Sequence, residues 1–424
     1  MSEQVKKEVI VYNETFPVYE RRSFGLQMTD SQERINMERM RRERLERARS
    51  HMKEAGITVM LLLEDTNMRY TVGLSWLGYT TGGAYVLLPL EGEPIVFPHG
   101  APLQDRREGG MTWIKKENIK RQVRGPSRRT KLLNPAAFEF EASQFAQQIK
   151  RSLERMRLAK EVLTLDTHSD IIPALEKEGI RTAVDDEVLV RAQVIKTQDE
   201  IACFRQLGAL VDLVHYELAK YAEPGKTELE LAGYMNFIAM KHGAEPRPNC
   251  LVVSGNNTHP NHFMSTDRTL RHGDIFYADT IQISWCGYKS CCYRDYSCVT
   301  PPTQAAKDAM KELVDLTYAA LSDCKPGNTT ADMMRHWAKH EFMRILVGGG
   351  HGLGILNYGP PNLGVETAIK FPEEIKEGMV FAIEPFQGIG DGQGVKLEEM
   401  VVVTKTGYEV LTHAPLEIVT CPLR

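Results

Sequence analysis

The apolar positions of the chain change their spacing several times, and each change indicates a new helix or strand. An amphipathic helix is expected from Asp30 to Gly56, because Asp30 and Glu33 have the spacing of a capping box at its start. The apolar residues of this segment recur at helical intervals; they are Met37, Met40, Leu45, Ala48, Met52 and Ala55.

Short apolar runs at residues 57–63, 84–88 and 94–97 predict strands, and the pattern at 138–160 predicts another helix. This alternation favours an α/β domain over residues 31–188, preceded by a polar arm of residues 1–30. Within the domain, residues 106–131 include ten basic side chains. A solvated loop face is the simpler interpretation of this stretch, and an anion or partner site is the alternative.

A second domain is expected over residues 189–424. It opens with a long amphipathic helix over residues 195–221, which ends before a Pro-Gly pair. The sequence Pro-Gly-X-Thr occurs at 224–227 and again at 326–329, each time with a threonine placed to cap a helix. The repeat suggests a duplicated half-domain.

Composition and charge exclude several classes of protein. The chain has 424 residues, 52 basic against 56 acidic, and a formal charge of −4, which gives no general attraction to nucleic acid or to an anionic membrane. No apolar run approaches the roughly 20 residues of a membrane span. Eight cysteines are too few for a disulfide scaffold, so reduced thiols and a cytoplasmic location are expected.

Candidate chemistry is concentrated in the second domain. Glu384 follows the apolar run 380–383, and Glu398 precedes the apolar run 400–403. An ionised carboxylate is costly in an apolar strand unless it is paired, although either glutamate alone could face solvent. Together with Asp279 and with His351, which glycines flank on both sides, these residues would suit acid/base catalysis or a metal site.

The motifs resemble those of a known superfamily. Residues 350–354, the pair Glu384-Pro385 and residues 396–398 look like the catalytic domain of the creatinase, prolidase and methionine aminopeptidase superfamily, which has the pita-bread fold. The first half similarly resembles the N-terminal domain of creatinases and prolidases. The resemblance therefore implies an α/β N-terminal domain followed by a pita-bread catalytic domain.

In the metallopeptidases of this family, five residues in the order Asp, Asp, His, Glu, Glu hold two divalent metals. The second aspartate falls on Cys291 when the sequence is counted without a gap, and a gapped alternative would place Asp295 there. The ungapped version is favoured, because an insertion would break the alternation of a strand. The resemblance assigns the remaining four places to Asp279, His351, Glu384 and Glu398.

Loss of a bridging carboxylate resembles creatinase, the metal-free hydrolase of the family. Tyr358 also stands where the peptidases have a second histidine, and Tyr293 where creatinase has a substrate-binding glutamate. The resulting expectation is a metal-independent hydrolase without a cofactor, which opens a C–N bond in a small zwitterionic or amidine-like compound. If a metal were present, its expected ligands would be Asp279, His351, Glu384 and Glu398.

Roles follow from the same resemblance. His262 is expected to act as general acid and base, with His259 as a competitor for that role. Glu384 and Glu398 would hold a cationic group or orient the water. The expected substrate-binding residues are His351, Tyr358, Asp279, Tyr293 and Trp76.

Other hypotheses stay open at the level of sequence. A C–S lyase like the dimethylsulfoniopropionate lyases, a metal-dependent Xaa-Pro peptidase and an inactive scaffold are the alternatives to the hydrolase. A zinc site made of Cys286, Cys291, Cys292 and Cys298 is disfavoured, because neighbouring strand residues point to opposite faces. A homodimer is expected by resemblance, with Trp76, Tyr79 or Arg69 reaching the pocket of the partner.

Overall fold

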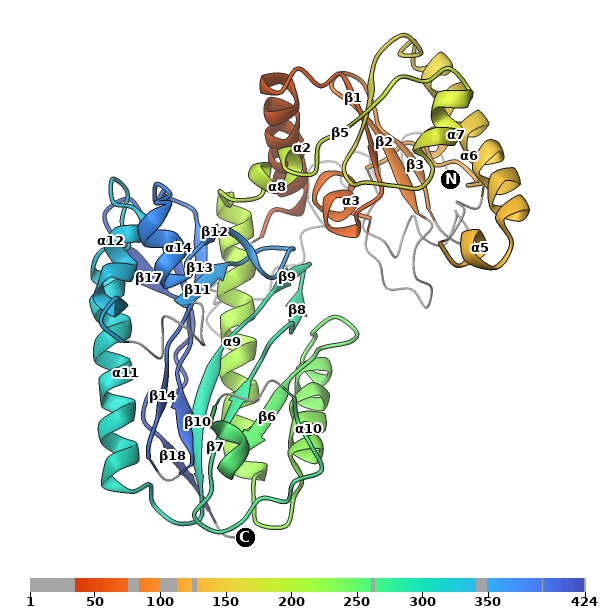
Figure 1. Ribbon diagram of the computed structural model, residues 1–424. Coiled ribbons are helices and arrows are strands. Elements are labelled where there is room, and N and C mark those ends of the chain that lie inside the picture. Colours follow the sequence, from red (N-terminus) through yellow and green to blue (C-terminus); the bar gives the residue numbers. More distant parts are fainter. Residues whose placement is uncertain are drawn as a thin grey trace, which may run out of the picture.

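The computed structural model describes residues 35–74, 84–98, 113–123, 128–260, 264–340, 349–390 and 392–422. Within them, helices and strands form two sheet-containing domains joined by one long helix, as Figure 1 shows. None of the described helices is both long and apolar enough to cross a membrane. The expected order, an α/β N-terminal domain followed by a second sheet-containing domain, is confirmed.

The N-terminal domain contains a five-stranded sheet in the order β3-β2-β1-β4-β5. β1 pairs antiparallel with β2 and parallel with β4, so the sheet is mixed. The predicted strands at 57–63, 84–88 and 94–97 agree with β1, β2 and β3. The strands are β1 (Val59–Leu62), β2 (Tyr85–Pro89), β3 (Ile95–Phe97), β4 (Leu163–Leu165) and β5 (Thr182–Val184).

Helix α2 (Met37–Glu54) begins later than its sequence suggests. Asn36 caps it, because its side chain accepts the backbone N–H of Arg39, whereas the expected capping pair Asp30 and Glu33 lies outside the described residues. The helix ends at Glu54 and the chain turns at Gly56, whose φ is +69°. The other helices of this domain are α3 (Asp65–Val72), η1 (Lys116–Asn118), α5 (Arg128–Leu133), α6 (Pro135–Arg155) and α7 (Ile172–Lys177).

Helices α8 (Val188–Ala192) and α9 (Gln198–Tyr221) connect the domains, so the expected division after residue 188 falls at the first residue of α8. A capping box of Thr197 and Glu200 starts α9. The two Pro-Gly-X-Thr segments also start helices: Thr227 caps α10 (Glu228–Lys241), and Thr329 caps α12 (Thr330–Met334). The predicted side-chain cap is present at Thr227, which accepts the backbone N–H of Glu230, whereas Thr329 stands at the N-cap and donates from Oγ1 to Asp332 Oδ2 at 2.7 Å.

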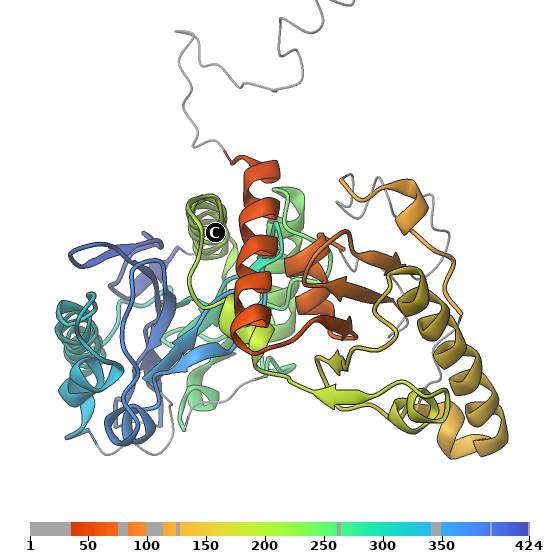
Figure 2. The same cartoon turned by 90° about the horizontal axis from the view of Figure 1, so that it is seen from above.

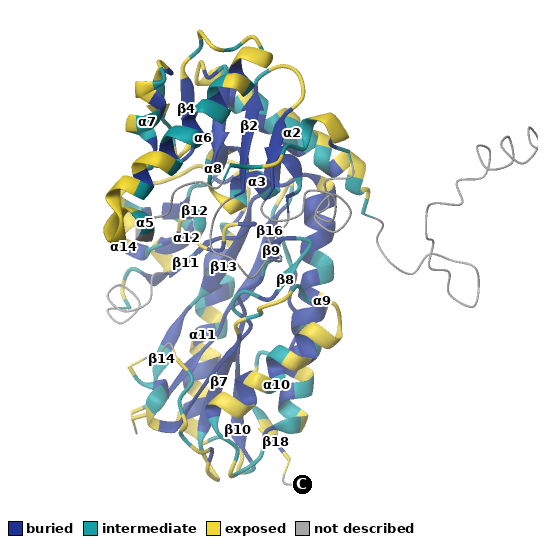
Figure 3. Cartoon of the chain, turned by 90° about the vertical axis from the view of Figure 1, so that its right-hand side faces the viewer, coloured by how far each residue is buried: buried dark blue, intermediate teal, exposed yellow. Residues whose placement is uncertain are grey.

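Two larger sheets form the catalytic domain, in the orders β18-β10-β7-β6 and β12-β11-β13-β16-β17. Helices α9 and α10 pack on the first sheet, and α11 packs beside β14 and β15, so that the strands lie between helices (Figure 1). Most described residues of the inner strands are buried, as Figure 3 shows.

The other elements of this domain, within the described residues, are as follows. The helices are η2 (Gly255–Thr258), α11 (Gln304–Ser322), η3 (Arg335–Trp337) and α14 (Val365–Lys370). The strands are β6 (Leu251–Ser254), β7 (Ile275–Asp279), β8 (Ser284–Trp285), β9 (Tyr288–Lys289), β10 (Tyr293–Cys298), β11 (Gly349–Gly352), β12 (Gly359–Asn362), β13 (Val380–Glu384), β14 (Phe386–Gly388), β15 (Gly394–Lys396), β16 (Glu399–Val403), β17 (Tyr408–Val410) and β18 (Val419–Cys421).

Helix α2 stands at the junction of the two domains (Figure 2). Its Arg39 donates from Nε to Asp199 Oδ2 of α9 at 2.7 Å and from Nη2 to Oδ1 at 2.9 Å. Its Arg44, only 3% exposed, donates to the Tyr288 hydroxyl at 3.2 Å. One hydrophobic cluster runs from Met40 of α2 to Phe204 of α9. The junction therefore combines apolar burial with charged hydrogen bonds.

Candidate active site

Four of the predicted site residues are placed by strands of two sheets. Asp279 is the last residue of β7, Glu384 is the last of β13, and Glu398 lies between β15 and β16. His351 lies within β11, where Ala382 of β13 is its backbone neighbour. Strands β11, β13 and β16 are hydrogen-bonded in the five-stranded sheet of this domain, whereas β7 belongs to its four-stranded sheet. Residues that are far apart in sequence therefore meet where the two sheets face each other.

Cys291, His351 and Glu398 form the tightest group, and we call it the Cys-His-Glu triad. One possible ligand atom of each residue lies within 4.8 Å of the other two. The distance from His351 Nε2 to Glu398 Oε1 is 3.9 Å. The sulfur of Cys291 also lies 3.9 Å from Asp279 Oδ1, which accepts the backbone N–H of Cys292 at 3.2 Å. Cys291 therefore faces the site, as the ungapped interpretation expects.

Asp295, the gapped alternative, makes different contacts. It lies opposite Tyr277 in the β7–β10 pairing, and its carboxylate accepts the backbone N–H of Lys396 at 3.1 Å. Asp295 thus joins β10 to β15. Cys292 is not part of the triad, and its sulfur lies 3.4 Å from the backbone oxygen of Glu398. In the part of the chain that the structure describes, Cys291 alone of the four hairpin cysteines joins a group of possible metal ligands.

The position of His351 depends on neighbouring glycines. A Cβ on Gly350 would lie 2.2 Å from the backbone oxygen of Ala382, and one on Gly352 would lie 2.1 Å from that of Pro360. Because such distances are too short for any side chain, strand β11 fits between β12 and β13 only with glycine at these positions. The close approach carries His351 towards Glu398.

Lys396 is the site residue that sequence reasoning missed. Its ammonium lies 3.0 Å from Glu384 Oε2 and 3.8 Å from the centre of the Tyr293 ring, and its side chain is 1% exposed. The available signal was its position between apolar neighbours, Val395 and Leu397, two residues before Glu398. A lysine at such a position must find a buried anion or leave the strand.

Burial and mutual repulsion shift the titration of these groups. Burial raises the pKa of Asp279 to about 7; Lys396 opposes this rise and Glu384 adds to it. Burial also raises the pKa of Glu398 well above its usual range, with Glu384 and Asp279 contributing. For Lys396, burial acts to lower the pKa, but attraction to Glu384 and Glu398 outweighs it and raises the pKa. The cluster therefore has more acidic groups than the lysine can neutralise.

Two predicted substrate-binding tyrosines lie on different sides of this cluster. Tyr358 is 58% exposed, and its ring centre lies 4.4 Å from that of His351, so it is placed to contact an incoming ligand. Tyr293 is buried beneath Lys396 and also packs edge-on against Tyr277. Tyr293 is therefore placed to hold the lysine.

Other predicted residues lie elsewhere or cannot be placed. His262, the expected general base, and Trp76 and Tyr79 are outside the described residues. His259 packs against Phe386, with ring centres 6.1 Å apart. Arg69 forms an ion pair with Glu245 of its own chain.

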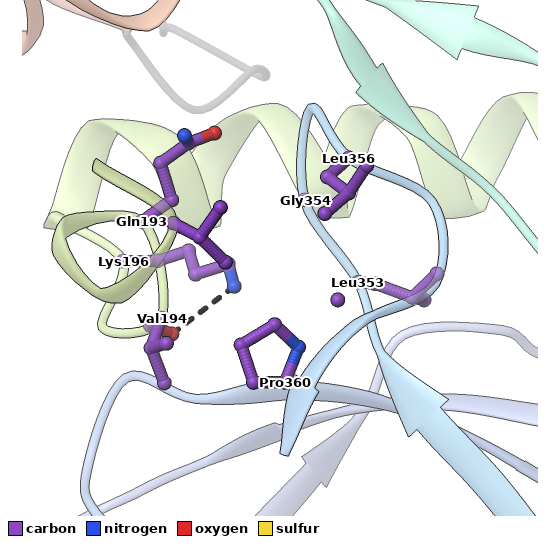
Figure 4. A pocket seen from close by; sticks show the side chains of 9 residues that line it. Gln193, Val194, Lys196, Leu353, Gly354, Leu356 and Pro360 are labelled. Atoms are coloured by element: carbon purple, nitrogen blue, oxygen red, sulfur yellow. Dashed lines mark hydrogen bonds between the residues drawn. The ribbon is translucent and has the colours of Figure 1, made fainter. Parts of the chain in front are cut away.

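A small cavity lies next to β11 but does not include the Cys-His-Glu triad. Its volume of about 20 Å³ has room for one water molecule. Figure 4 shows Lys196 reaching into it and donating to the backbone oxygen of Val194, while Leu353, Gly354 and Pro360 form the opposite wall. Burial lowers the pKa of Lys196 to about 8. The cavity is too small for a substrate.

Comparison with known proteins agrees with this arrangement. Residues 202–405 match the model of metallopeptidase family M24, and residues 44–189 match the creatinase/prolidase N-terminal domain. The chain therefore belongs to the creatinase, prolidase and methionine aminopeptidase superfamily with the pita-bread fold. The membership predicted from the motifs is confirmed, and the matched catalytic domain is that of a hydrolase family.

Three relatives illustrate the similarity. The chain is 26% identical over 260 residues to the probable dipeptidase PepE of Mycobacterium tuberculosis, covering 60% of this chain and 68% of that protein. It is 24% identical over 385 residues to the uncharacterized peptidase YqhT of Bacillus subtilis, covering 89% and 99%. A solved prolidase from Thermococcus sibiricus superposes with a TM-score of 0.71 at 24% identity, covering 90% of this chain and 99% of that one.

These relatives correct the expected activity. The prediction of a metal-independent hydrolase acting on a non-peptide C–N bond is wrong, because the catalytic domain matches a metallopeptidase family and the relatives are named peptidases. The error came from treating the missing aspartate at position 291 as the loss of the whole metal site. A thiol at that position can itself be a metal ligand.

The donors of this chain fit a metal ion at the Cys-His-Glu triad. Within the described residues, His351 Nε2 and both carboxylate oxygens of Glu398 are buried without a hydrogen-bond partner. His351 Nδ1 donates to the backbone oxygen of Gly352 at 3.2 Å, which leaves the lone pair on Nε2. Buried acceptors without donors are costly, and a bound cation would satisfy them.

Proposed function

We propose that the protein is a metal-dependent peptidase that removes the N-terminal residue of a dipeptide or other small peptide. The observation that carries the proposal is the Cys-His-Glu triad, which brings three buried possible metal ligands together in a domain of the metallopeptidase family. The relatives named dipeptidase and prolidase support a peptide substrate. The proposal replaces the metal-independent hydrolase.

Cys291, His351 and Glu398 would hold the metal. When bound, a dication at such a site polarises a carbonyl group and lowers the pKa of a coordinated water. Glu384, whose side chain is 16% exposed, would take the proton of the attacking water and pass it to the leaving amine. Asp279 would bind the α-ammonium group of the substrate, and the exposed ring of Tyr358 would contact its side chain.

The assembly is part of the same proposal. A homodimer follows from the resemblance to creatinases and prolidases, in which the N-terminal domain of one protomer reaches the pocket of the other. Light scattering on the purified protein would give a mass of twice 47.9 kDa if this is correct. A mass of one chain would contradict it.

Peptide cleavage with and without metal tests the function. The protein should release free amino acids from dipeptides, with or without proline at the second position, after loading with Zn²⁺, Co²⁺ or Mn²⁺, and a chelator should stop the reaction. Glu384→Gln should lower kcat by about 10²-fold or more, because the neutral amide cannot take the proton. Glu374→Gln, a glutamate with 63% side-chain exposure, is the matched control and should leave kcat unchanged.

Two outcomes would contradict the proposal. One is the failure of every metal to support cleavage of any dipeptide by a folded protein. The other is equal activity of Glu384→Gln and the unsubstituted protein, which would exclude Glu384 from the proton transfer.

A further inference from the structure

We infer that this site holds a single metal ion with a sulfur ligand, and that the ammonium of Lys396 provides fixed positive charge where the family has a second metal. The inference rests on the proposed function and deepens it. It concerns the number and the kind of metal, neither of which follows from family membership, because the metallopeptidases of the family use five nitrogen and oxygen ligands for two ions.

The first argument is the set of donors. Cys291, His351 and Glu398 offer one sulfur, one nitrogen and one oxygen, and each residue is at least nine-tenths buried. Ligand atoms around one tetrahedral zinc ion lie about 3.5 Å apart. The distance of 3.9 Å between His351 Nε2 and Glu398 Oε1 is already close to that value. Three protein ligands and one open position are the usual composition of a catalytic zinc site.

The second argument is the place left for another ion. Of the five expected ligands, only Asp279 and Glu384 remain outside the triad. Glu384 already pairs with Lys396 at 3.0 Å, and the lysine cannot retreat easily, because its side chain is 1% exposed and lies on the Tyr293 ring. A dication bound by Asp279 and Glu384 would stand beside this ammonium in a site of low dielectric, where repulsion between like charges is strong.

The third argument is the charge balance. The three carboxylates and the Cys291 thiolate carry four negative charges when all are ionised. Lys396 and one dication leave a single net negative charge, which matches the α-ammonium of the proposed peptide substrate. Two dications would make the site positive before the substrate arrives, and the ammonium would then be repelled.

The sulfur ligand also predicts the identity of the metal. Thiolate favours zinc and other borderline or soft ions, whereas carboxylate and water favour magnesium and manganese. The protein should therefore retain zinc or cobalt in preference to manganese after dialysis against a mixture of the three.

Cobalt substitution tests the inference without an activity assay. Co²⁺ added to the metal-free protein should produce a near-ultraviolet thiolate-to-cobalt charge-transfer band that saturates at one equivalent, and elemental analysis should find one zinc per chain in the native protein. Cys291→Ser should abolish the band and weaken Co²⁺ binding by about 10- to 100-fold or more. The matched control is Cys292→Ser, which changes the adjacent buried cysteine and should keep both the charge-transfer band and the affinity for Co²⁺.

Several results would overturn the inference. They are saturation at two equivalents, a charge-transfer band that persists in Cys291→Ser, and the absence of any bound cobalt. If Cys291→Ser does not fold, Cys291→Asp provides the same comparison, because it should bind cobalt without the band. Two ions with peptidase activity would reject the single-metal site alone, whereas one ion, a band and no cleavage of any peptide would reject the proposed function alone.

Discussion

Lys396 shows how a single residue can determine which groups share a buried site. Its ammonium lies against Glu384 and over the ring of Tyr293, in a cluster that also contains Asp279 and Glu398. Breaking a buried ion pair by removing one partner leaves the other charge without compensation, which is more costly than replacing both partners.

Lys396→Met should therefore destabilise the protein by about 3–5 kcal/mol. The double variant Lys396→Met/Glu384→Gln leaves no unpaired carboxylate at position 384. Its loss in the free energy of unfolding should therefore be smaller than the sum of the losses in the two single variants, by a coupling energy of roughly 1–3 kcal/mol. Denaturant unfolding of the four proteins measures this coupling.

An exposed pair provides the control for this cycle. Lys311 and Asp315 are 74% and 63% exposed and lie one helical turn apart, so the coupling between them should be much smaller than that of the buried pair. Equal coupling in the two pairs would show that Lys396 contributes no more than a surface charge.

The site was partly predictable from single residues. Asp279, His351, Glu384 and Glu398 were assigned by the resemblance to the family motifs, and counting along the strand selected Cys291 over Asp295. The sequence could not show that the Cys291 thiol faces His351 and Glu398, because that depends on the packing of two sheets. Lys396 was missed for the same reason, because only its ion pair with Glu384 explains why a lysine is buried there.

At the scale of elements, replacing a glycine by alanine should have opposite effects on stability in two helices. Gly208 of α9 lies against the chain at Leu411, where an added Cβ would come 1.9 Å from the backbone oxygen. Apart from the backbone of its own helix, no atom of the described residues lies within 4 Å of the position that a Cβ would take at Gly233 of α10.

Gly208→Ala should destabilise the protein by about 1–3 kcal/mol, because α9 must move away from Leu411. Gly233→Ala should stabilise it by about 0.5–1 kcal/mol, since alanine loses less backbone entropy than glycine in a helix. Thermal unfolding of both variants measures the difference. The same sign for both would contradict the packing of α9 against residue 411.

Elements with a strong local pattern were predicted well. The helices expected at 138–160 and 195–221 are present as α6 and α9, because their apolar spacing and caps are encoded within one turn. The start of α2 was displaced from Asp30 to Met37, since several polar residues in this region could cap a helix. The choice among them depends on contacts with α9, which a local pattern does not contain.

At the scale of the whole molecule, an ion pair ties helix α2 to the catalytic domain. The Asp199 side chain is 1% exposed and accepts two hydrogen bonds from Arg39, whose own side chain is 46% exposed. Asp199 also accepts the backbone N–H of Asn36 at 2.9 Å. Loss of the arginine would leave a buried carboxylate with one donor.

Arg39→Ala should therefore lower the free energy of unfolding, by an amount that solvent screening reduces because the arginine is partly exposed. Hydrogen exchange should become faster in the first turns of α2. Arg191→Ala is the matched control, because Arg191 pairs with Glu187 where both side chains are more than 60% exposed, and its effect should stay within about 0.5 kcal/mol. Equal effects would mean that the junction depends on apolar packing alone.

Strand β11 limits how the candidate active site can be redesigned. A methyl group at Gly349, Gly350 or Gly352 would meet the backbone of a neighbouring strand or loop. Three of the four residues of β11 therefore tolerate no side chain, and the fourth is His351. A mutant library aimed at a new substrate preference would gain nothing from this strand. Tyr358 is the position to vary instead, because its ring is exposed and contacts His351.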